Sequence, residues 1–281
     1  TNHLMVQGDP SPDGLKQLRI GLRRLRSLLR LFKREIDPAR AAWLNAEARW
    51  LAAEIATVRD LDVMLDDILL PELVRHPDSG LEKLRTAFAR RRQAALKRLR
   101  PLLAGERAQS LVIDAIALAQ VPAARRGRDP VICRAPKLLE RRWRKVVAMA
   151  EVLDELDIEQ RHELRKELKK MRYSVEYLRA LYPDETLKPF LKLLKRLQTV
   201  FGDLNDAAMA EMLLTGAKAP LGKDIEAQRA AGRLIGARWA IADLSWERAG
   251  QYWADLESIA PFWRASKSKK EMEPRHHSPI D

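Results

Sequence analysis

The sequence is poor in several residue types, and each shortage excludes a class of protein. Its 281 residues include one cysteine, Cys133, so an intramolecular disulfide framework is excluded and a reducing compartment is expected. Aromatic residues make up 6% of the chain and β-branched residues are scarce, which disfavours strands. No run approaches the ~18 consecutive apolar residues of a transmembrane helix. The first ten residues show no signal-peptide pattern. We therefore expect a cytoplasmic protein with no membrane partner.

Leu, Ala, Arg and Glu are abundant, and this composition favours an ordered helical protein. Hydrophobic residues make up 46% of the chain and charged residues 32%, with a formal net charge of +13. An excess of this size indicates a polyanionic partner such as nucleic acid, anionic lipid or polyphosphate. A basic surface without a specific ligand is the alternative that charge alone leaves open.

Apolar periodicity, prolines and capping residues predict eight helices and no strand. The expected ranges are about 12–35, 38–70, 81–103, 106–120, 131–153, 157–181, 185–214 and 221–259. A Pro-, Gly- and Arg-rich linker, 121–130, divides the chain into two halves of four helices each. Residues 265–281 are polar and basic without periodicity, and we expect a disordered tail there.

The stretch from Leu15 to Arg34 combines an apolar row with a basic row. The apolar row contains Leu15, Leu18, Leu22, Leu25, Leu29 and Phe32, and the basic row contains Lys16, Arg19, Arg23, Arg26 and Arg30. At about 100° per residue the basic row lies roughly a quarter turn from the apolar row. The charges therefore border the predicted core, where they could line a cleft. The stretch contains no acidic residue, so its like charges repel one another unless an anion binds.

The same pattern returns 146 residues later. The segment KQLRIGLRRLRS from Lys16 aligns with HELRKELKKMRY from His162. The basic pairs are Arg19 with Arg165, Arg23 with Lys169, Arg24 with Lys170, Arg26 with Arg172 and, further on, Arg49 with Lys195. The offset also carries Arg59-Asp60 onto Asn205-Asp206. A repeat in constant register predicts two equivalent helical hairpins related by pseudo-two-fold symmetry.

The repeated pattern His-x-x-Arg-x-x-x-[Arg/Lys]-[Arg/Lys]-x-Arg resembles the CHAD family, the conserved histidine α-helical domain. Each copy is followed by a helix that ends in Arg-Asp-Leu-Asp or Leu-Asn-Asp, and the resemblance runs from about residue 9 to residue 263. It implies an all-α fold of two pseudo-two-fold-related four-helix bundles. It also implies a basic central channel that binds inorganic polyphosphate, and association with polyphosphate granules.

One position departs from the family pattern. The first copy has Lys16 where the family has its histidine, and His162 keeps it. A lysine can still contact phosphate, but imidazole titration is lost at that position. His162 itself could contact phosphate or serve as a structural histidine. The resemblance implies this polyphosphate-binding set: Lys16, Arg19, Arg23, Arg24, Arg26, Arg30, His162, Arg165, Lys169, Lys170, Arg172, Arg49 and Lys195.

We expect a single domain over 9–264, built of repeats at about 9–120 and 131–264, with the tail at 265–281. Asp60, Asp62 and Asp206 are interpreted as ion-pair partners of basic helices rather than metal ligands. The tryptophans, at helical spacing, are interpreted as core residues. No Gly-rich phosphate loop, metal-ligand cluster or nucleophile–base pair is visible, so we expect no enzyme, no metal and no cofactor.

Two alternatives to non-catalytic polyphosphate binding remain from the sequence. A nucleic-acid-binding helical protein is favoured only by charge, because the basic row has no interleaved aromatic residues for base stacking. An accessory of a phosphate-polymer-processing enzyme is the other. Bound phosphate or sulfate ions would mimic the expected ligand, and the sequence does not determine the oligomeric state.

Overall fold

The computed structural model describes residues 10–120, 130–217 and 219–265. Within these ranges the secondary structure is helical and no strand is present, which confirms the all-α prediction. The chain divides into two compact units, of which unit 1 contains residues 1–125 and 203–243 and unit 2 contains residues 126–202 and 244–281. No helix of the described ranges is long and apolar enough to cross a membrane. Most of the predicted linker and the tail from 266 onward lie outside the described residues.

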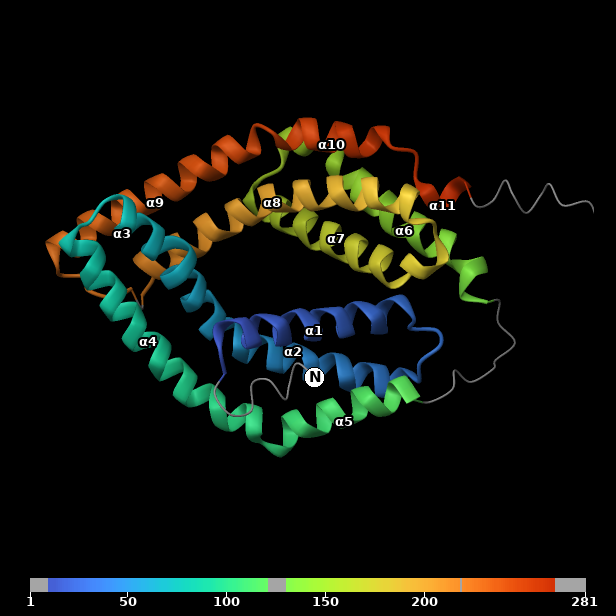
Figure 1. Ribbon diagram of the computed structural model, residues 1–281, viewed down its shortest axis with the longest axis horizontal. Helices are drawn as coiled ribbons and strands as arrows, with labels where there is room; N and C mark the ends of the chain where they lie inside the picture. Colours follow the sequence, from blue (N-terminus) through green and yellow to red (C-terminus); the bar gives the residue numbers. More distant parts are fainter. Residues whose placement is uncertain (1–9, 121–129, 218, 266–281) are drawn as a thin grey trace, which may run out of the picture. The chain divides into compact units, whose positions relative to one another are not determined.

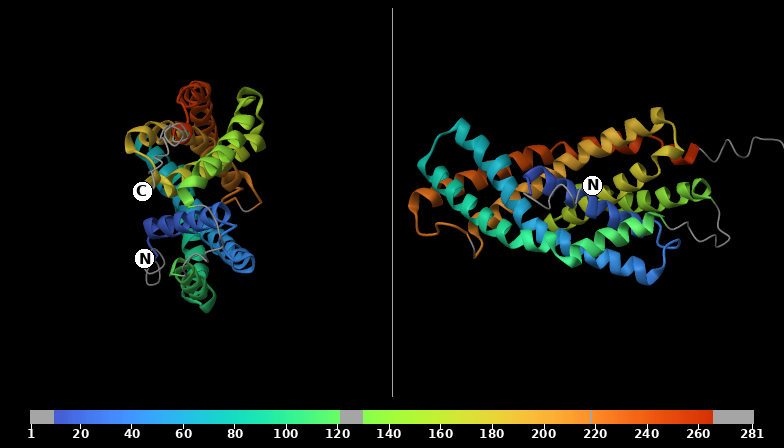
Figure 2. Two further views of the ribbon diagram at one scale, coloured as in Figure 1. Left: turned by 90° about the vertical axis from the view of Figure 1, so that its right-hand side faces the viewer. Right: turned by 60° about the horizontal axis from the view of Figure 1, so that its bottom comes forward.

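Unit 1 begins with a hairpin of two antiparallel helices, α1 (Pro12–Leu31) and α2 (Pro38–Asp62), which lie side by side in Figures 1 and 2. Each helix starts with a capped turn. The Ser11 hydroxyl accepts a hydrogen bond from the backbone N–H of Gly14 at 3.0 Å, and the Asp37 carboxylate accepts one from Arg40 at 2.8 Å. A proline occupies the first turn of both helices, where its missing N–H breaks no bond.

The chain continues past α2 without the expected stop at Pro71. The π-helix η2 (Val63–Leu69) follows α2, and α3 (Leu70–Arg75) follows η2. The backbone N–H of Leu70 bonds to the carbonyl of Leu65, five residues back. Pro71 then lies in the first turn of α3, so its missing N–H and its ring are tolerated. The prediction that the helix ends before Pro71 was wrong for this reason.

The remaining helices of unit 1 complete a single apolar core. They are α4 (Ser79–Ala104), α5 (Glu106–Gln120), the second part of α8 (Asp184–Thr215) and most of α9 (Ile225–Trp246). Leu15, Leu51 and Phe88 are fully buried in this core. Leu213 and Leu234, from the second half of the sequence, belong to the same cluster. Unit 1 is therefore built from two separate stretches of chain.

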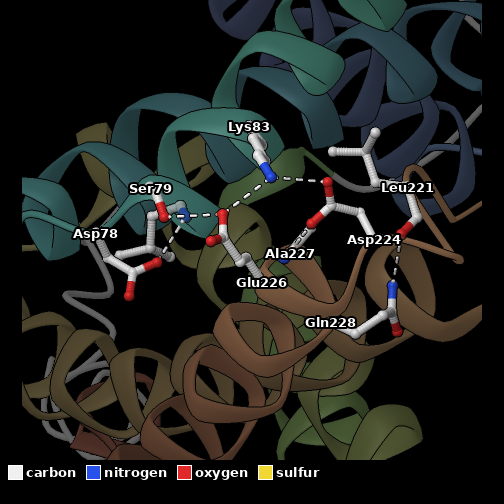
Figure 3. A network of polar contacts seen from close by, with 9 residues as sticks. Asp78, Ser79, Lys83, Leu221, Asp224, Glu226, Ala227 and Gln228 are labelled. Atoms are coloured by element: carbon white, nitrogen blue, oxygen red, sulfur yellow. Dashed lines mark hydrogen bonds and ion pairs between the residues drawn. The ribbon is translucent and has the colours of Figure 1, made fainter.

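A polar network joins the beginnings of α4 and α9 (Figure 3). The Lys83 ammonium lies 2.9 Å from a carboxylate oxygen of Asp224 and 2.9 Å from one of Glu226, and the Ser79 hydroxyl donates to Glu226 at 3.0 Å. At the same crossing a Cβ on Gly80 would collide with the backbone carbonyl of Glu226. A glycine is needed here because the two helices approach backbone to backbone.

Unit 2 is organised around an aromatic core. Its helices are α6 (Val131–Ala150), α7 (Ile158–Tyr177), the first part of α8, α10 (Ala249–Ser258) and α11 (Phe262–Ala265), with short 3₁₀ turns η3 (Leu153–Glu155) and η4 (Arg179–Leu181). Trp143 stacks on Trp253 with ring centroids 5.5 Å apart, and meets Phe190 edge-on at 5.4 Å. Trp263 is 1% exposed. The prediction that the tryptophans are core residues is confirmed for these three and is wrong for Trp43, which is 39% exposed.

The last long helix predicted over 221–259 is not continuous. Its first residues form a turn in which Leu221 has a positive φ of 57°. The Asp224 carboxylate accepts a hydrogen bond from the backbone N–H of Ala227 at 3.0 Å, which caps α9 and sets its start. A second break separates α9 from α10, where the Arg248 N–H bonds to the carbonyl of Ser245 in a tight turn. The first turn begins at Pro220 and contains Gly222, whereas the second break, at 247–248, contains neither proline nor glycine and had no signal in the sequence.

Candidate anion-binding site

The basic row of α1 lies beside its buried apolar row, as the periodicity predicts. Leu15, Leu18, Leu22 and Leu29 are at most 6% exposed. The basic side chains divide into two groups: Lys16, Arg24 and Arg30 are exposed, and Arg19, Arg23 and Arg26 are half-buried. Half-buried guanidinium groups keep their alkyl stems on the core and direct their charge outward. The α1 stripe is defined here as these six residues together with Arg49 of α2.

Unneutralised positive charge gathers at the C-terminal half of the α1 stripe. The Arg26 Nε donates to the amide oxygen of Asn45 at 3.2 Å, and this acceptor is neutral. Burial lowers the pKa of Arg26, and repulsion from Arg30 and Arg49 lowers it further. Among the residues that the structure describes, Arg30 and Arg49 have no acidic partner. Three guanidinium groups therefore share one location without a carboxylate, which favours binding of an anion.

The N-terminal half of the α1 stripe has an internal carboxylate. Asp60 of α2 lies 3.8 Å from an Nη atom of Arg19, with both side chains about one-third exposed. Burial raises the pKa of Asp60, Arg19 and Arg59 oppose that rise, and nearby Asp206 adds to it. The Nε of Arg23 is buried and has no acceptor among the described residues. Arg19 is thus paired within unit 1.

Asp62 has a different role from Asp60. It is fully buried, and one carboxylate oxygen accepts a hydrogen bond from the Nε of Arg92 on α4 at 2.5 Å. Arg59, one turn earlier on α2, is 3.7 Å from the other oxygen. Burial raises the pKa of Asp62 against the opposing effect of Arg92. Asp62 therefore fixes α4 to α2, through an arginine that the sequence did not distinguish from its basic neighbours.

The second basic row lies on α7 in unit 2, and a capping box fixes the start of this helix. Asp157 and Gln160 form a capping box, in which each side chain accepts a hydrogen bond from the other residue's backbone N–H at 2.8 and 2.9 Å. His162 is exposed in the first turn. Desolvation by its neighbours lowers the pKa of His162, and the charges of Lys166 and Arg165 lower it further. These effects favour the neutral imidazole in the free protein.

Acidic residues neutralise more of the α7 row than the sequence suggested. Glu167 is 2% exposed and receives hydrogen bonds from Lys170 at 2.6 Å and from Lys145 of α6 at 2.8 Å. Burial opposes its ionisation, yet these two lysines hold the pKa of Glu167 below its usual value. Arg172 lies 3.4 Å from Glu176, one turn later. The charges of Lys170 and Arg172 are therefore partly neutralised within unit 2.

The predicted site residues are divided between the two units. Lys16, Arg19, Arg23, Arg24, Arg26, Arg30 and Arg49 belong to unit 1, and His162, Arg165, Lys169, Lys170, Arg172 and Lys195 belong to unit 2. Sequence reasoning missed Asn45, Glu167 and Lys145. The pair of Glu167 with Lys170 was readable from its spacing of three residues on one helix. The contact of Glu167 with Lys145 joins two helices and had no local signal.

A family model described as the CHAD domain matches residues 2–215 of the chain, a range that contains both basic rows. The chain belongs to the CHAD family.

Curated relatives of this CHAD chain are longer than the chain itself. Two Mycobacterium tuberculosis proteins described as uncharacterized, Rv2226 of strain H37Rv and MT2285 of strain CDC 1551, are each 28% identical over 214 residues. The match covers 70% of this chain and 39% of each relative. The chain therefore spans well under half the length of these relatives, which contain further sequence.

Two solved structures share the CHAD fold of this chain. A CHAD domain from the plant Ricinus communis has a TM-score of 0.74 at 24% identity, covering 92% of this chain and 86% of that one. PptA from Streptomyces chartreusis has a TM-score of 0.63 at 16% identity, covering 87% of this chain and 90% of PptA. At these identities the likeness establishes the fold alone.

Outside the two basic rows, a surface pocket of about 740 Å³ lies between α6 and α11 of the CHAD chain. Its lining includes Lys137, Arg141 and Glu140. Glu140 receives hydrogen bonds from Arg264 at 2.9 and 3.0 Å and from the Trp263 indole at 2.9 Å. Arg264 above all, with Trp263 and Arg144, lowers the pKa of Glu140 to about 2. Its partners identify Glu140 as the anchor of α11. No group of three or more metal-ligand side chains occurs in the described ranges.

Proposed function

We propose that this CHAD chain binds inorganic polyphosphate without processing it, through the α1 stripe and the basic row of α7. The observation that carries the proposal is the group of Arg26, Arg30 and Arg49. Among the residues that the structure describes, its only side-chain hydrogen-bond partner is the neutral Asn45. Polyphosphate offers closely spaced anionic oxygens and no base, so its recognition depends on charge-assisted contacts. Arginine makes such contacts in forked, bidentate geometry.

We further propose that the chain is built of two repeats, at about 9–120 and 131–264, each of which forms a four-helix bundle in a pseudo-two-fold arrangement. The constant offset of 146 residues between the basic rows supports this relation. The CHAD resemblance, which implies polyphosphate granules as the destination of bacterial members, supports a role in attaching the protein to such granules.

The spacing of the α1 stripe suits a linear polyanion. Arg19, Arg23, Arg26 and Arg30 follow one another at three or four residues, so successive cations are about 5–6 Å apart along one face of the helix. Tyr173, beside Arg172, is 3% exposed, so its ring is not available for stacking on a base. This burial favours a ligand without bases over nucleic acid.

The test measures binding of fluorescently labelled polyphosphate in competition with DNA and RNA at physiological salt. Replacing Arg26, Arg30, Arg49 and Lys169 together with glutamine should abolish binding with the helical circular dichroism unchanged. The matched control removes four exposed charges that have no acidic partner among the described residues: Arg90, Lys97, Arg98 and Lys223. Arg92 is unsuitable as a control because it holds the buried Asp62.

Three results would contradict the proposal. An equal loss from the control variant would assign the affinity to overall charge. Displacement of polyphosphate by nucleic acid at equal phosphate concentration would favour the nucleic-acid alternative. Release of phosphate or shortening of the polymer, with or without a divalent cation, would support an enzyme.

A further inference from the structure

The two basic rows differ in the acidic residues that accompany them. α1 carries six basic side chains and one acidic side chain, Asp13 in its first turn. α7 carries six basic side chains besides His162, and four acidic ones. At the offset of 146, Glu163 replaces Gln17, Glu167 replaces Gly21 and Glu176 replaces Arg30. The repeat has thus kept four basic positions (Arg19, Arg23, Arg24 and Arg26), while the second copy has gained acidic residues between them and a glutamate in place of Arg30.

In the absence of ligand, these glutamates form ion pairs with basic residues of α7. Glu167 is buried and bonded to two lysines, so a phosphate that displaced it from Lys170 would leave this buried carboxylate with Lys145 as its remaining lysine partner. Glu176 lies 3.4 Å from Arg172 and faces the same guanidinium that a phosphate would contact. A ligand at α7 must therefore compete with, or lie beside, negative charge.

The equivalent positions of the α1 stripe present the opposite situation. Arg30 stands where α7 has Glu176, so Arg26 has a second cation as its neighbour instead of an acid. Arg49 contributes a third cation from α2. An anion at this point relieves repulsion among three guanidinium groups and displaces no carboxylate, so both effects favour its binding.

We infer that the two rows bind the polymer unequally: the group of Arg26, Arg30 and Arg49 is the principal oligophosphate site, able to hold a short chain alone. The α7 row adds affinity only for longer chains. This inference rests on the proposed function and extends it to the distribution of affinity and to chain length. Glu176 is the residue that most directly weakens the second row.

The experiment compares tripolyphosphate with polyphosphate of about 100 units by isothermal titration calorimetry. The first variant is Arg26→Gln, Arg30→Gln and Arg49→Gln, and the matched variant is Lys169→Gln, Arg172→Gln and Lys195→Gln. Each removes three charges. For tripolyphosphate, the first variant should lose at least about 30-fold in affinity, because each charge-assisted contact contributes roughly tenfold or more. The matched variant should lose less than about threefold. For the long polymer both variants should lose affinity.

A gain-of-affinity variant provides a second readout that does not depend on removing a site. Glu176→Gln should raise affinity for the long polymer by about fourfold, the effect of removing one charge about 5 Å from a phosphate in a high-dielectric environment. The control Glu151→Gln removes an exposed acid with no partner among the described residues and should change affinity less than twofold. The double variant Arg30→Gln, Arg49→Gln changes only exposed residues, and is used if the triple variant does not fold.

The outcomes separate the inference from the proposed function. Equal losses of tripolyphosphate affinity in the two triple variants, or equal effects of the two glutamate substitutions, would overturn the inequality and leave polyphosphate binding intact. A wild-type protein that binds neither phosphate ligand would overturn the proposed function itself.

Discussion

The buried ion pair between α2 and α4 allows a quantitative prediction about stability. Asp62 is 0% exposed, and its partners Arg92 and Arg59 have side chains that are 17% and 16% exposed. Asp62→Ala removes the carboxylate and leaves the Arg92 guanidinium in a largely buried position without its hydrogen-bond acceptor. Breaking one side of such a pair costs about 3–5 kcal/mol in the free energy of unfolding.

The pair as a whole should contribute much less than this. Burial raises the pKa of Asp62 in spite of two neighbouring guanidinium groups, so desolvation of the carboxylate outweighs their attraction. A raised pKa means that the folded state holds the proton to higher pH than the unfolded state. Stability from this group is therefore complete below the usual value of 3.8 and declines as the pH rises through the folded-state pKa.

The double variant Asp62→Leu, Arg92→Met tests this reasoning. It replaces the pair with apolar side chains, and Arg59 keeps Asp67 at 3.5 Å as its partner. We expect the double variant to lie within about 1 kcal/mol of wild type at pH 7, far less than either single change. Urea unfolding followed by circular dichroism at 222 nm compares wild type, Asp62→Ala, the single variants Asp62→Leu and Arg92→Met, and the double variant. A cost below about 1 kcal/mol for Asp62→Ala, or additive costs in the double variant, would refute the argument.

Two further predictions concern pH. Glu140→Gln should destabilise unit 2 by about 1–2 kcal/mol at pH 7, because its carboxylate is bonded to Arg264 and Trp263. The folded-state pKa of Glu140 is about 2 and its usual value is 4.5, so this difference in stability should disappear as the pH falls from 4.5 toward 2. Parallel pH profiles of urea unfolding for the two proteins would contradict this prediction. Polyphosphate affinity should rise modestly on acidification, mostly below pH 6.5, because the free His162 has a lowered pKa and a bound anion favours its charged form. Binding titrations at pH 8, 6.5 and 5 check this. An identical pH profile in His162→Ala would exclude the imidazole as the cause of the rise.

Local sequence signals determined most of the helices. The fourth expected helix, 106–120, coincides with α5, and the starts at Pro12 and Pro38 agree because Ser11 and Asp37 cap them. Pro71 misled the prediction, since the preceding π-helix removes the conflict that a proline normally creates. The breaks around α9 depend on the Asp224 cap and a left-handed Leu221, which composition alone does not reveal.

The basic residues of the candidate site were identifiable from periodicity, but their electrostatic state was not. Spacing placed Arg26 and Arg30 on one face of α1, and the structure adds Asn45 as a neutral acceptor and Arg49 as a third cation. The neutralisation of Lys145 by Glu167 requires two helices to pack, as does the contact of Asp62 with Arg92. Such pairs arise from tertiary structure and have no fixed sequence separation.

The two-part composition of unit 1 has a consequence for how the protein is made. Leu84 and Phe88 of α4 belong to the same core cluster as Ala230 and Leu234 of α9, which are synthesised about 140 residues later. During translation the first four helices must therefore wait, with part of their apolar surface uncovered, until the chain has emerged past residue 234. At ordinary synthesis rates of about 5–20 residues per second this exposure lasts about 7–28 seconds, during which the uncovered apolar surface favours aggregation.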